Sequence, residues 1–145
     1  MAAIRAKNTK PELVVRRSLH AAGYRFRLHN KDLPGCPDIV LAKHRAAILV
    51  NGCFFHGHEC ETFRWPATRA KFWREKIHSN RARDQRNIAR LQDAGWRVLT
   101  VWECAIRSTE LRRKLALKAI HGWLVSSSAL SEIAAAAETT AVGSN

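Results

Sequence analysis

Ala46-Ala47-Ile48-Leu49-Val50 runs directly into Asn51-Gly52-Cys53-Phe54-Phe55-His56-Gly57-His58-Glu59-Cys60. The apolar run has the length of one buried strand, which predicts that the polar stretch after it is a loop at the end of that strand. The loop carries two thiols, two imidazoles and two adjacent phenylalanines. Thiolates and imidazoles are ligands that suit zinc, so the segment indicates a metal-binding loop.

The loop alone leaves the identity of the metal ligands open. Four of its side chains are close enough in sequence to share an ion, namely Cys53, His56, His58 and Cys60. Cys104, far down the chain, can supply a further sulfur. The competing interpretation is that the cysteines are small core residues and the histidines polar surface groups, because this spacing is not a common zinc-finger spacing.

Composition and charge narrow the class of protein. The 145 residues fit one domain, and a hydrophobic fraction of 46% is ordinary for a globular chain. The net charge of +13 predicts a polyanionic partner, with nucleic acid as the first candidate and a membrane surface as the second. Because the N-terminus lacks an apolar signal core, we expect a cytosolic protein with reduced cysteines, and interpret Cys36 as an ordinary thiol.

Local signals predict alternating helices and strands, and therefore a mixed α/β domain. Thr9 before Pro11 and Glu12 predicts a helix start, and Gly23 its end. Strands are expected over residues 24–28, 37–41, 46–50 and 96–102. The second and third of these should form a hairpin at the centre of the sheet. Cys104 follows the last strand, so we expect it to be held on the sheet.

Two more helices are expected, over residues 68–94 and 109–124. The first is strongly basic, with Phe72, Ile77, Ile88 and Leu91 as its buried side. Its positive charges are Arg69, Lys71, Arg74, Lys76, Arg81, Arg83, Arg86 and Arg90. From residue 126 onward the chain is rich in Ser and Ala and almost uncharged. We therefore expect residues 1–125 to form the domain and 126–145 a low-complexity tail.

Five sequence blocks, in this order, resemble those of the very-short-patch repair (Vsr) endonucleases. They are Thr9-Lys10-Pro11-Glu12; Leu33-Pro34-Gly35-x-Pro37-Asp38; Gly52-Cys53-Phe54-x-His56; Pro66-Ala67-Thr68-Arg69 with Phe72-Trp73; and Trp96-Arg97-Val98 with Val101-Trp102-Glu103-Cys104. The similarity runs from Ile4 to Cys104, continues more weakly to Trp123, and does not cover the expected tail.

The resemblance implies a monomeric nuclease of the restriction-endonuclease-like, PD-(D/E)xK fold, with a mixed sheet flanked by helices. It implies a magnesium-dependent nick on the 5′ side of the thymine in a T:G mismatch, the lesion left when 5-methylcytosine deaminates. It also implies a separate structural zinc. The partners implied are duplex DNA with a T:G mismatch, a cytosine methyltransferase and the general mismatch-repair proteins.

The resemblance also assigns metal ligands. Asp38 is expected to bind magnesium directly with the backbone carbonyl of Val50, while Glu12 supports the site through water. Magnesium takes oxygen ligands and keeps several waters, so one carboxylate and one carbonyl suffice. The implied zinc ligands are Cys53, His58, Cys60 and Cys104, a closed and therefore structural set.

Catalytic and DNA-contacting residues follow from the same resemblance. His56 resembles the general base that takes a proton from the attacking water, and Asp84 the carboxylate that orients it. The expected DNA contacts are Phe54, Phe55, Trp73 and Arg69. The three aromatics resemble a wedge that enters the base stack beside the mismatch, where a mispaired step opens at lower cost. The competing interpretation, most serious for Trp73, is core packing.

Two positions depart from the family pattern. Asn51 stands where a histidine assists catalysis, and Phe55 stands at a tryptophan position. Asparagine donates hydrogen bonds but carries no charge and transfers no proton at neutral pH. Two alternatives to mismatch nicking therefore stay open. One is a restriction-type or structure-specific nuclease of the same fold, and the other is a catalytically weakened, zinc-stabilised DNA-binding protein.

Overall fold

A mixed sheet forms the centre of the computed structural model, which describes residues 7–135. Its five strands lie in chain order: β1 (Arg27–Leu28), β2 (Ile39–Leu41), β3 (Ala46–Asn51), β4 (Arg97–Trp102) and β5 (Leu130–Ile133). The first three strands pair antiparallel in succession, whereas β4 is parallel to both β3 and β5. The predicted α/β fold and its central hairpin are confirmed, with a short 3₁₀ turn, η2 (Ala42–His44), joining β2 to β3.

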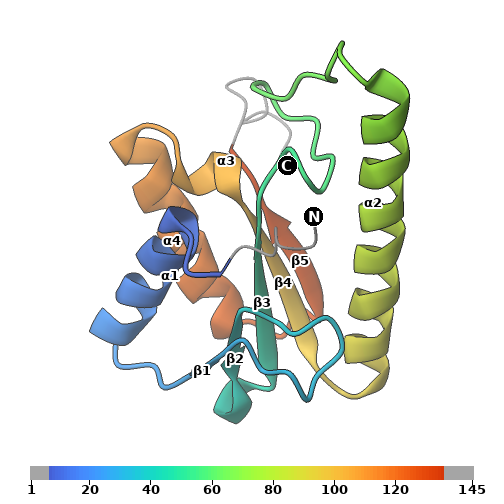
Figure 1. The fold of residues 1–145 in the computed structure, drawn as a ribbon. Helices are drawn as coiled ribbons and strands as arrows, with labels where there is room; N and C mark the ends of the chain where they lie inside the picture. Colours follow the sequence, from blue (N-terminus) through green and yellow to red (C-terminus); the bar gives the residue numbers. More distant parts are fainter. Residues whose placement is uncertain (1–6, 136–145) are drawn as a thin grey trace.

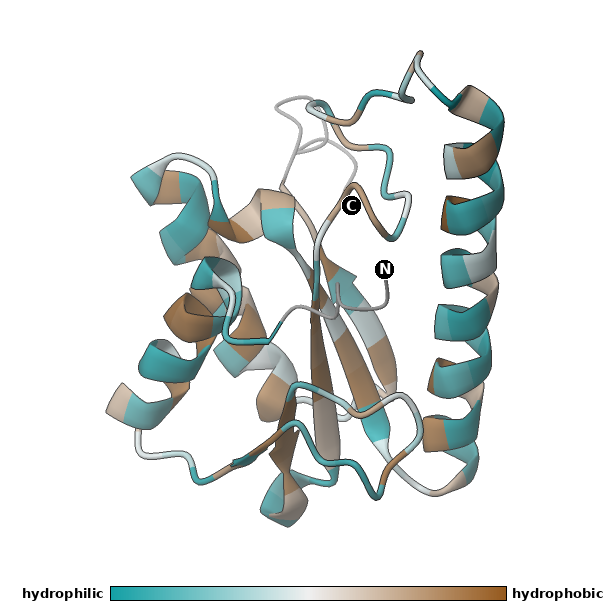
Figure 2. Ribbon diagram, in the orientation of Figure 1, coloured by the Kyte–Doolittle hydropathy of each residue, from teal (hydrophilic) through white to brown (hydrophobic). Residues whose placement is uncertain are grey.

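Helices cover both faces of the sheet. On one face lie α1 (Lys10–Ala21), α3 (Glu103–Ile106) and α4 (Glu110–Leu124), and on the other lies α2 (Ala70–Asp93) (Figure 1). The strands are largely apolar, whereas α2 is hydrophilic over most of its surface (Figure 2). Its only buried side chains are Ile77, Asn80 and Leu91. Among residues 7–135, no helix has both the length and the apolar character needed to cross a bilayer.

The helix ends follow the capping signals in the sequence. Thr9 Oγ1 accepts a hydrogen bond from the Glu12 backbone N–H at 3.3 Å, which caps α1. Thr109 Oγ1 does the same for α4, accepting from the Arg112 N–H at 3.1 Å. Gly23 follows the end of α1 in the left-handed conformation that favours glycine, with φ of +89°. The predicted starts of these two helices are confirmed.

Three local predictions are corrected. The strand expected over residues 24–28 is limited to Arg27–Leu28. Cys104 lies in the short helix α3, which begins directly after β4, and not on the sheet itself. Phe72 is 42% exposed, because the first turns of α2 lie beside the long loop after β3 and not over the sheet (Figure 1).

The expected tail is wrong for Leu130–Ile133, which form β5. This strand pairs in parallel with β4, with Val98 opposite Leu130 and Val101 opposite Ile133. The amino-acid composition of this segment carries no strand signal. The segment becomes a strand because its backbone forms hydrogen bonds with β4, which would otherwise be an open edge of the sheet. Residues 136–145 of the expected tail lie outside the described part of the chain.

Arg97 ties the C-terminal end of α4 to the sheet. Its guanidinium donates to the carbonyls of Trp123 at 2.6 Å, Ser126 at 3.0 Å and Leu124 at 3.2 Å. It also lies 4.2 Å from the centre of the Trp123 ring. The last carbonyls of a helix have no partner within the helix, and a cation there also complements the helix dipole. One side chain of β4 therefore holds both α4 and the segment that leads to β5.

Replacing Arg97 by methionine should lower the free energy of unfolding by about 2–4 kcal/mol, because the last carbonyls of α4 lose a charged donor and the Trp123 ring loses its cation. Urea denaturation followed by circular dichroism measures this change. Arg86→Met, at an exposed position of α2, is the control and should shift stability by no more than about 0.5 kcal/mol. Equal losses in the two variants would contradict the role given to Arg97.

Candidate functional site

The site forms where β2 begins and β3 and β4 end. The parallel register places Asn51, the last residue of β3, opposite Trp102, the last residue of β4. The chain then enters the long loop from one strand and α3 from the other. Because β2 is antiparallel to β3, its start lies at the same edge, where Asp38 Oδ2 accepts a hydrogen bond from the Val50 N–H at 2.8 Å.

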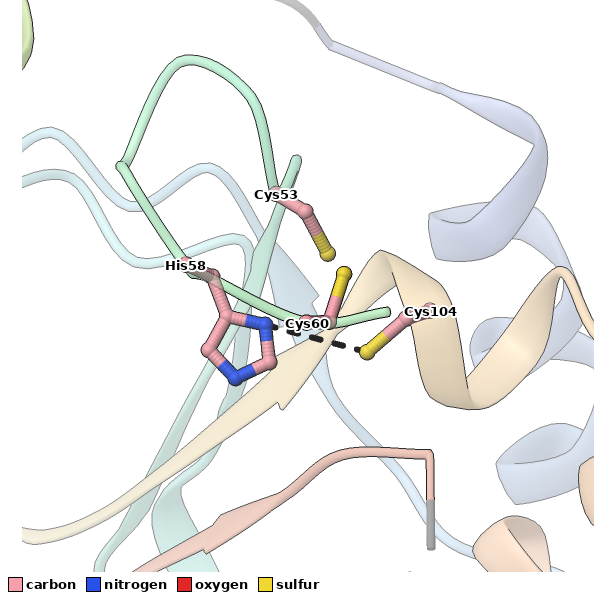
Figure 3. A group of neighbouring side chains, drawn as sticks. All are labelled: Cys53, His58, Cys60 and Cys104. Atoms are coloured by element: carbon pink, nitrogen blue, oxygen red, sulfur yellow. Dashed lines mark hydrogen bonds between the residues drawn. The ribbon is translucent and has the colours of Figure 1, made fainter. Parts of the chain in front are cut away.

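Cys53, His58, Cys60 and Cys104 form one group of side chains, the Cys/His cluster (Figure 3). One ligand atom from each residue lies within 4.8 Å of the others, and Cys104 Sγ is 3.7 Å from His58 Nδ1. Ligand atoms around a tetrahedral zinc are about 3.6–3.8 Å apart, given the usual Zn–S and Zn–N lengths. The donor atoms and their spacing therefore fit zinc. His56 is not a member of the cluster.

Two thiols of the cluster, Cys53 and Cys104, differ in acidity. A hydrogen bond to Cys104, together with burial, raises the pKa of Cys53 far above its usual value. The same hydrogen bond lowers the pKa of Cys104 to about 5, although burial opposes this. The Ala135 N–H also donates to Cys104 Sγ, at 3.3 Å. The lowered pKa of Cys104 favours the thiolate, the form that binds metal.

Side chains of β4 and β5 hold the His58 ring of the Cys/His cluster in place. The Trp102 ring stacks on the His58 imidazole, with centroids 4.2 Å apart and an interplanar angle of 6°. Trp102 Nε1 donates in turn to Glu132 Oε1 at 2.8 Å. Glu132 and Ala135 both come from the stretch where the sequence predicted a tail. Sequence analysis therefore missed them, and no local motif would have identified them.

Helix α2 holds the other side of the loop. Asn80 Nδ2 donates to the Phe55 carbonyl at 2.8 Å, and Arg81 donates to the Gly57 carbonyl. Gly57 has φ of +65°, and a Cβ there would lie 2.5 Å from Ile77 Cγ2. Only glycine allows this close approach without strain. Neither Asn80 nor Arg81 was assigned to the site from the sequence.

A cleft of about 980 Å³ contains most of the predicted catalytic residues. Among its lining residues are Asp38, Val50, Asn51, Phe55, His56 and Asp84. His56 Nδ1 lies 2.5 Å from Asp84 Oδ2, and each side chain is about a quarter exposed (27% and 26%). Several cations line the same cleft: Lys10, Lys31, Lys76, Arg83 and Arg107. A cleft lined by cations attracts polyanions.

Glu12 and Asp38 belong to a second group of possible metal ligands, together with His29. Glu12 is 1% exposed, and its Oε2 lies 2.7 Å from His29 Nε2 and 3.2 Å from the Arg16 guanidinium. The structure thus brings the two expected carboxylates of the magnesium site into one neighbourhood. It adds His29, a lone histidine after a short strand that sequence analysis did not single out.

Phe54, Phe55 and Trp73 form the aromatic cluster. The Phe54 ring centroid lies 5.1 Å from those of both Phe55 and Trp73. Phe55 is 39% exposed, and none of the three belongs to the two buried cores around the sheet. Phe72 extends this surface, with the Arg69 guanidinium 4.2 Å above its ring. The aromatics expected to contact DNA therefore pack against one another outside these two cores, with Phe55 exposed.

The fold and the site define a mixed α/β protein with a Cys/His cluster compatible with zinc and a cleft lined by cations, which suits a polyanionic substrate.

Comparison with known proteins identifies the family. A family model described as DNA mismatch endonuclease Vsr matches residues 1–62. The chain is 43% identical over 134 residues to DNA mismatch endonuclease Vsr of Escherichia coli, covering 92% of this chain and 86% of that protein. It is 54% identical over 106 residues to the Type II nicking enzyme V.XorIIP of Xanthomonas oryzae pv. oryzae, covering 73% and 78%. The chain belongs to the Vsr family of DNA endonucleases, so the resemblance stated from the sequence is confirmed.

Replacing Cys60 by serine should remove zinc from the purified protein and lower its melting temperature by at least roughly 5 °C, since the binding energy of a structural metal contributes to folding. Elemental analysis and a thermal melt measure the two effects. Cys36→Ser is the matched control, because Cys36 lies outside the Cys/His cluster, and it should retain its zinc. An unchanged zinc content in Cys60→Ser would show that the ligand set is wrong.

Proposed function

We propose that this chain nicks duplex DNA on the 5′ side of the thymine in a T:G mismatch. The observation that carries the proposal is the arrangement around one cleft of Asp38, the His56–Asp84 pair and the aromatic cluster, whose Phe55 lines the cleft. Cleavage at a mismatch requires a held phosphate, a proton acceptor and a group that separates bases, and these residues can supply all three. The name of the Escherichia coli relative agrees with this substrate.

Asp38 is proposed as the magnesium ligand, with the Val50 carbonyl and with Glu12 close by. The donors fit, because they are the hard oxygen ligands that magnesium prefers. The Val50 N–H holds Asp38 Oδ2 at 2.8 Å, so β3 orients the carboxylate before DNA arrives. When bound there, magnesium would stabilise the negative charge that develops on the phosphate and the leaving oxygen.

His56 is proposed as the general base. Its Nδ1 faces Asp84, and a carboxylate there favours the tautomer that carries the proton on Nδ1. Nε2 is then the ring nitrogen that accepts a proton from the attacking water. Asn51 lines the same cleft and can donate a hydrogen bond to a phosphate oxygen.

The aromatic cluster is proposed as the element that recognises the mismatch. Inserting rings between base pairs costs about a few kcal/mol per step, and less where a mispair already weakens the stack. Phe55 is the most exposed member, and Asn80 fixes its backbone carbonyl. Arg69, beside Phe72, can pair with a phosphate near the opened step.

A second candidate is a nicking enzyme of the same fold that acts in another sequence or structural context. The 54% identity to the Type II nicking enzyme V.XorIIP favours it. A third, a DNA-binding protein without cleavage, follows from Asn51 at the position of the assisting histidine. All three would bind DNA more weakly as salt increases, because the same phosphate contacts are screened.

A strand-labelled duplex with one T:G pair inside a cytosine-methylation sequence separates these candidates. Matched T:A and C:G duplexes serve as controls, each with magnesium or with EDTA. We expect one magnesium-dependent nick 5′ to the mismatched thymine and none in the matched duplexes. Equal cutting of all three duplexes would favour the second candidate, and tight binding without a cut under any metal would favour the third.

Replacing Asp38 by alanine should reduce nicking at least about 10³-fold, because several kcal/mol of transition-state stabilisation would be lost. DNA affinity and melting temperature should change little. Asp32→Ala, an exposed carboxylate of the preceding loop, is the control and should retain activity. Full activity of Asp38→Ala would refute the proposed magnesium ligand.

Replacing Asp84 by asparagine should lower the rate of nicking by roughly 10²–10⁴-fold while binding of mismatched DNA persists, because an amide no longer favours the same histidine tautomer. Single-turnover nicking and a gel-shift assay measure the two quantities. Asp93→Asn, at an exposed position of the same helix, is the matched control. A parallel loss of rate and binding would indicate a structural role for Asp84.

A further inference from the structure

We infer that His29 is a positioning residue that holds Glu12 at the metal site of Asp38, a role that rests on the proposed function. The backbone of His29 is bonded to Asp38, its ring contacts Glu12, and it thereby joins α1 to the sheet.

Strand pairing fixes the backbone of His29 beside Asp38. Leu28 pairs with Ile39 across β1 and β2, so the next residue, His29, stands opposite Asp38. The His29 N–H donates to the Asp38 carbonyl at 3.0 Å. His29 also has φ of 46°, a left-handed conformation that costs a residue other than glycine roughly 1–2 kcal/mol. Such conformations persist where the surrounding structure imposes them, and they cluster at functional sites.

The ring of His29 lies between the two carboxylates. Its Nε2 is 2.7 Å from Glu12 Oε2 and 4.0 Å from Asp38 Oδ1. The side chain is 14% exposed, so the contact with Glu12 is largely shielded from solvent. A shielded hydrogen bond to a carboxylate is among the stronger polar contacts in a protein.

The other hydrogen bonds to the Glu12 carboxylate come from α1 and from the residues just before it. Asn8 donates its N–H to Oε1 at 3.1 Å, and Arg16, one turn later in α1, donates to Oε2 at 3.2 Å. Both can move with α1. His29 instead follows β1 and is bonded to the residue that starts β2, so it connects Glu12 to the sheet that carries Asp38. Without His29, α1 and the sheet would lose this direct link at the metal site.

A direct measurement of metal affinity distinguishes a positioning role of His29 from a contribution to the stability of the fold alone. Mn²⁺ serves as a paramagnetic probe for the magnesium site in the zinc-loaded protein, and electron paramagnetic resonance measures its affinity. His29→Ala should weaken Mn²⁺ binding by about 10–100-fold, the usual effect of losing a group that orients a ligand. His29→Gln keeps a donor and should restore most of the affinity. His20→Ala, an exposed histidine of α1, is the control, and thermal melts verify that every variant is folded.

Any one of four results would overturn the inference. If Asp38→Ala weakens Mn²⁺ binding but His29→Ala does not, the result supports the proposed magnesium site and refutes the positioning role of His29. If Asp38→Ala has no effect either, the proposed magnesium site fails together with the inference. If pulsed resonance shows a nitrogen coupling that His29→Ala removes, His29 is itself a ligand and does not act through Glu12. Should the alanine variant not fold, a loss of about tenfold or more in folded His29→Gln would also overturn the inference.

Discussion

The parallel pairing of β3 with β4 positions the whole candidate site. It places Asn51 opposite Trp102, so the chain leaves both strands at one edge of the sheet. Cys53 follows β3 and Cys104 follows β4, so the pairing brings together thiols from distant parts of the chain (Figure 3). The antiparallel strand β2 starts at the same edge and adds Asp38. A single backbone register therefore positions the Cys/His cluster and the carboxylates next to each other.

Polar contacts hold the loop between β3 and α2 from both sides. Asn80 and Arg81 of α2 bind its backbone carbonyls, and the Cys/His cluster holds its other side. Ring contacts add to this, since Phe54 packs against Phe63 of the loop and Trp73 of α2. Since the backbone is held in this way, Phe55 can stay exposed without collapsing into the core. Binding groups that are held in place lose less conformational entropy when they meet a partner.

Local features of the fold could be predicted from the sequence because their causes are local. Thr9 and Thr109 cap the helices that follow them, and the apolar run before Asn51 is a strand. The thiols and imidazoles of the loop indicated a metal by their residue types, although their spacing is not a common zinc-finger spacing. Cys104 was only a possible further ligand until the family resemblance assigned it, because its contribution arises from the pairing of strands far apart in sequence.

The features that were missed depend on contacts between separate elements. Leu130–Ile133 has little strand character of its own and forms β5 because β4 offers an open edge. Glu132 matters because that pairing places it beside Trp102. His29 acquires its position from the pairing of β1 with β2, and no motif surrounds it. The exposure of Phe72 depends on how far α2 extends past the sheet, which hydrophobic periodicity does not reveal.

The Cys/His cluster can also report whether β3 and β4 have paired in the native register. Three of its ligands are near neighbours in the chain, so even an unfolded molecule can bring them together, whereas Cys104 joins them only when β4 is paired with β3. A slip of one residue between these strands would turn the side chains of β4 to opposite faces and displace the helix that carries Cys104. A metal ion bound by all four residues would therefore require the native strand pairing. Such binding would distinguish the native arrangement from a mispaired one with the same helix and strand content.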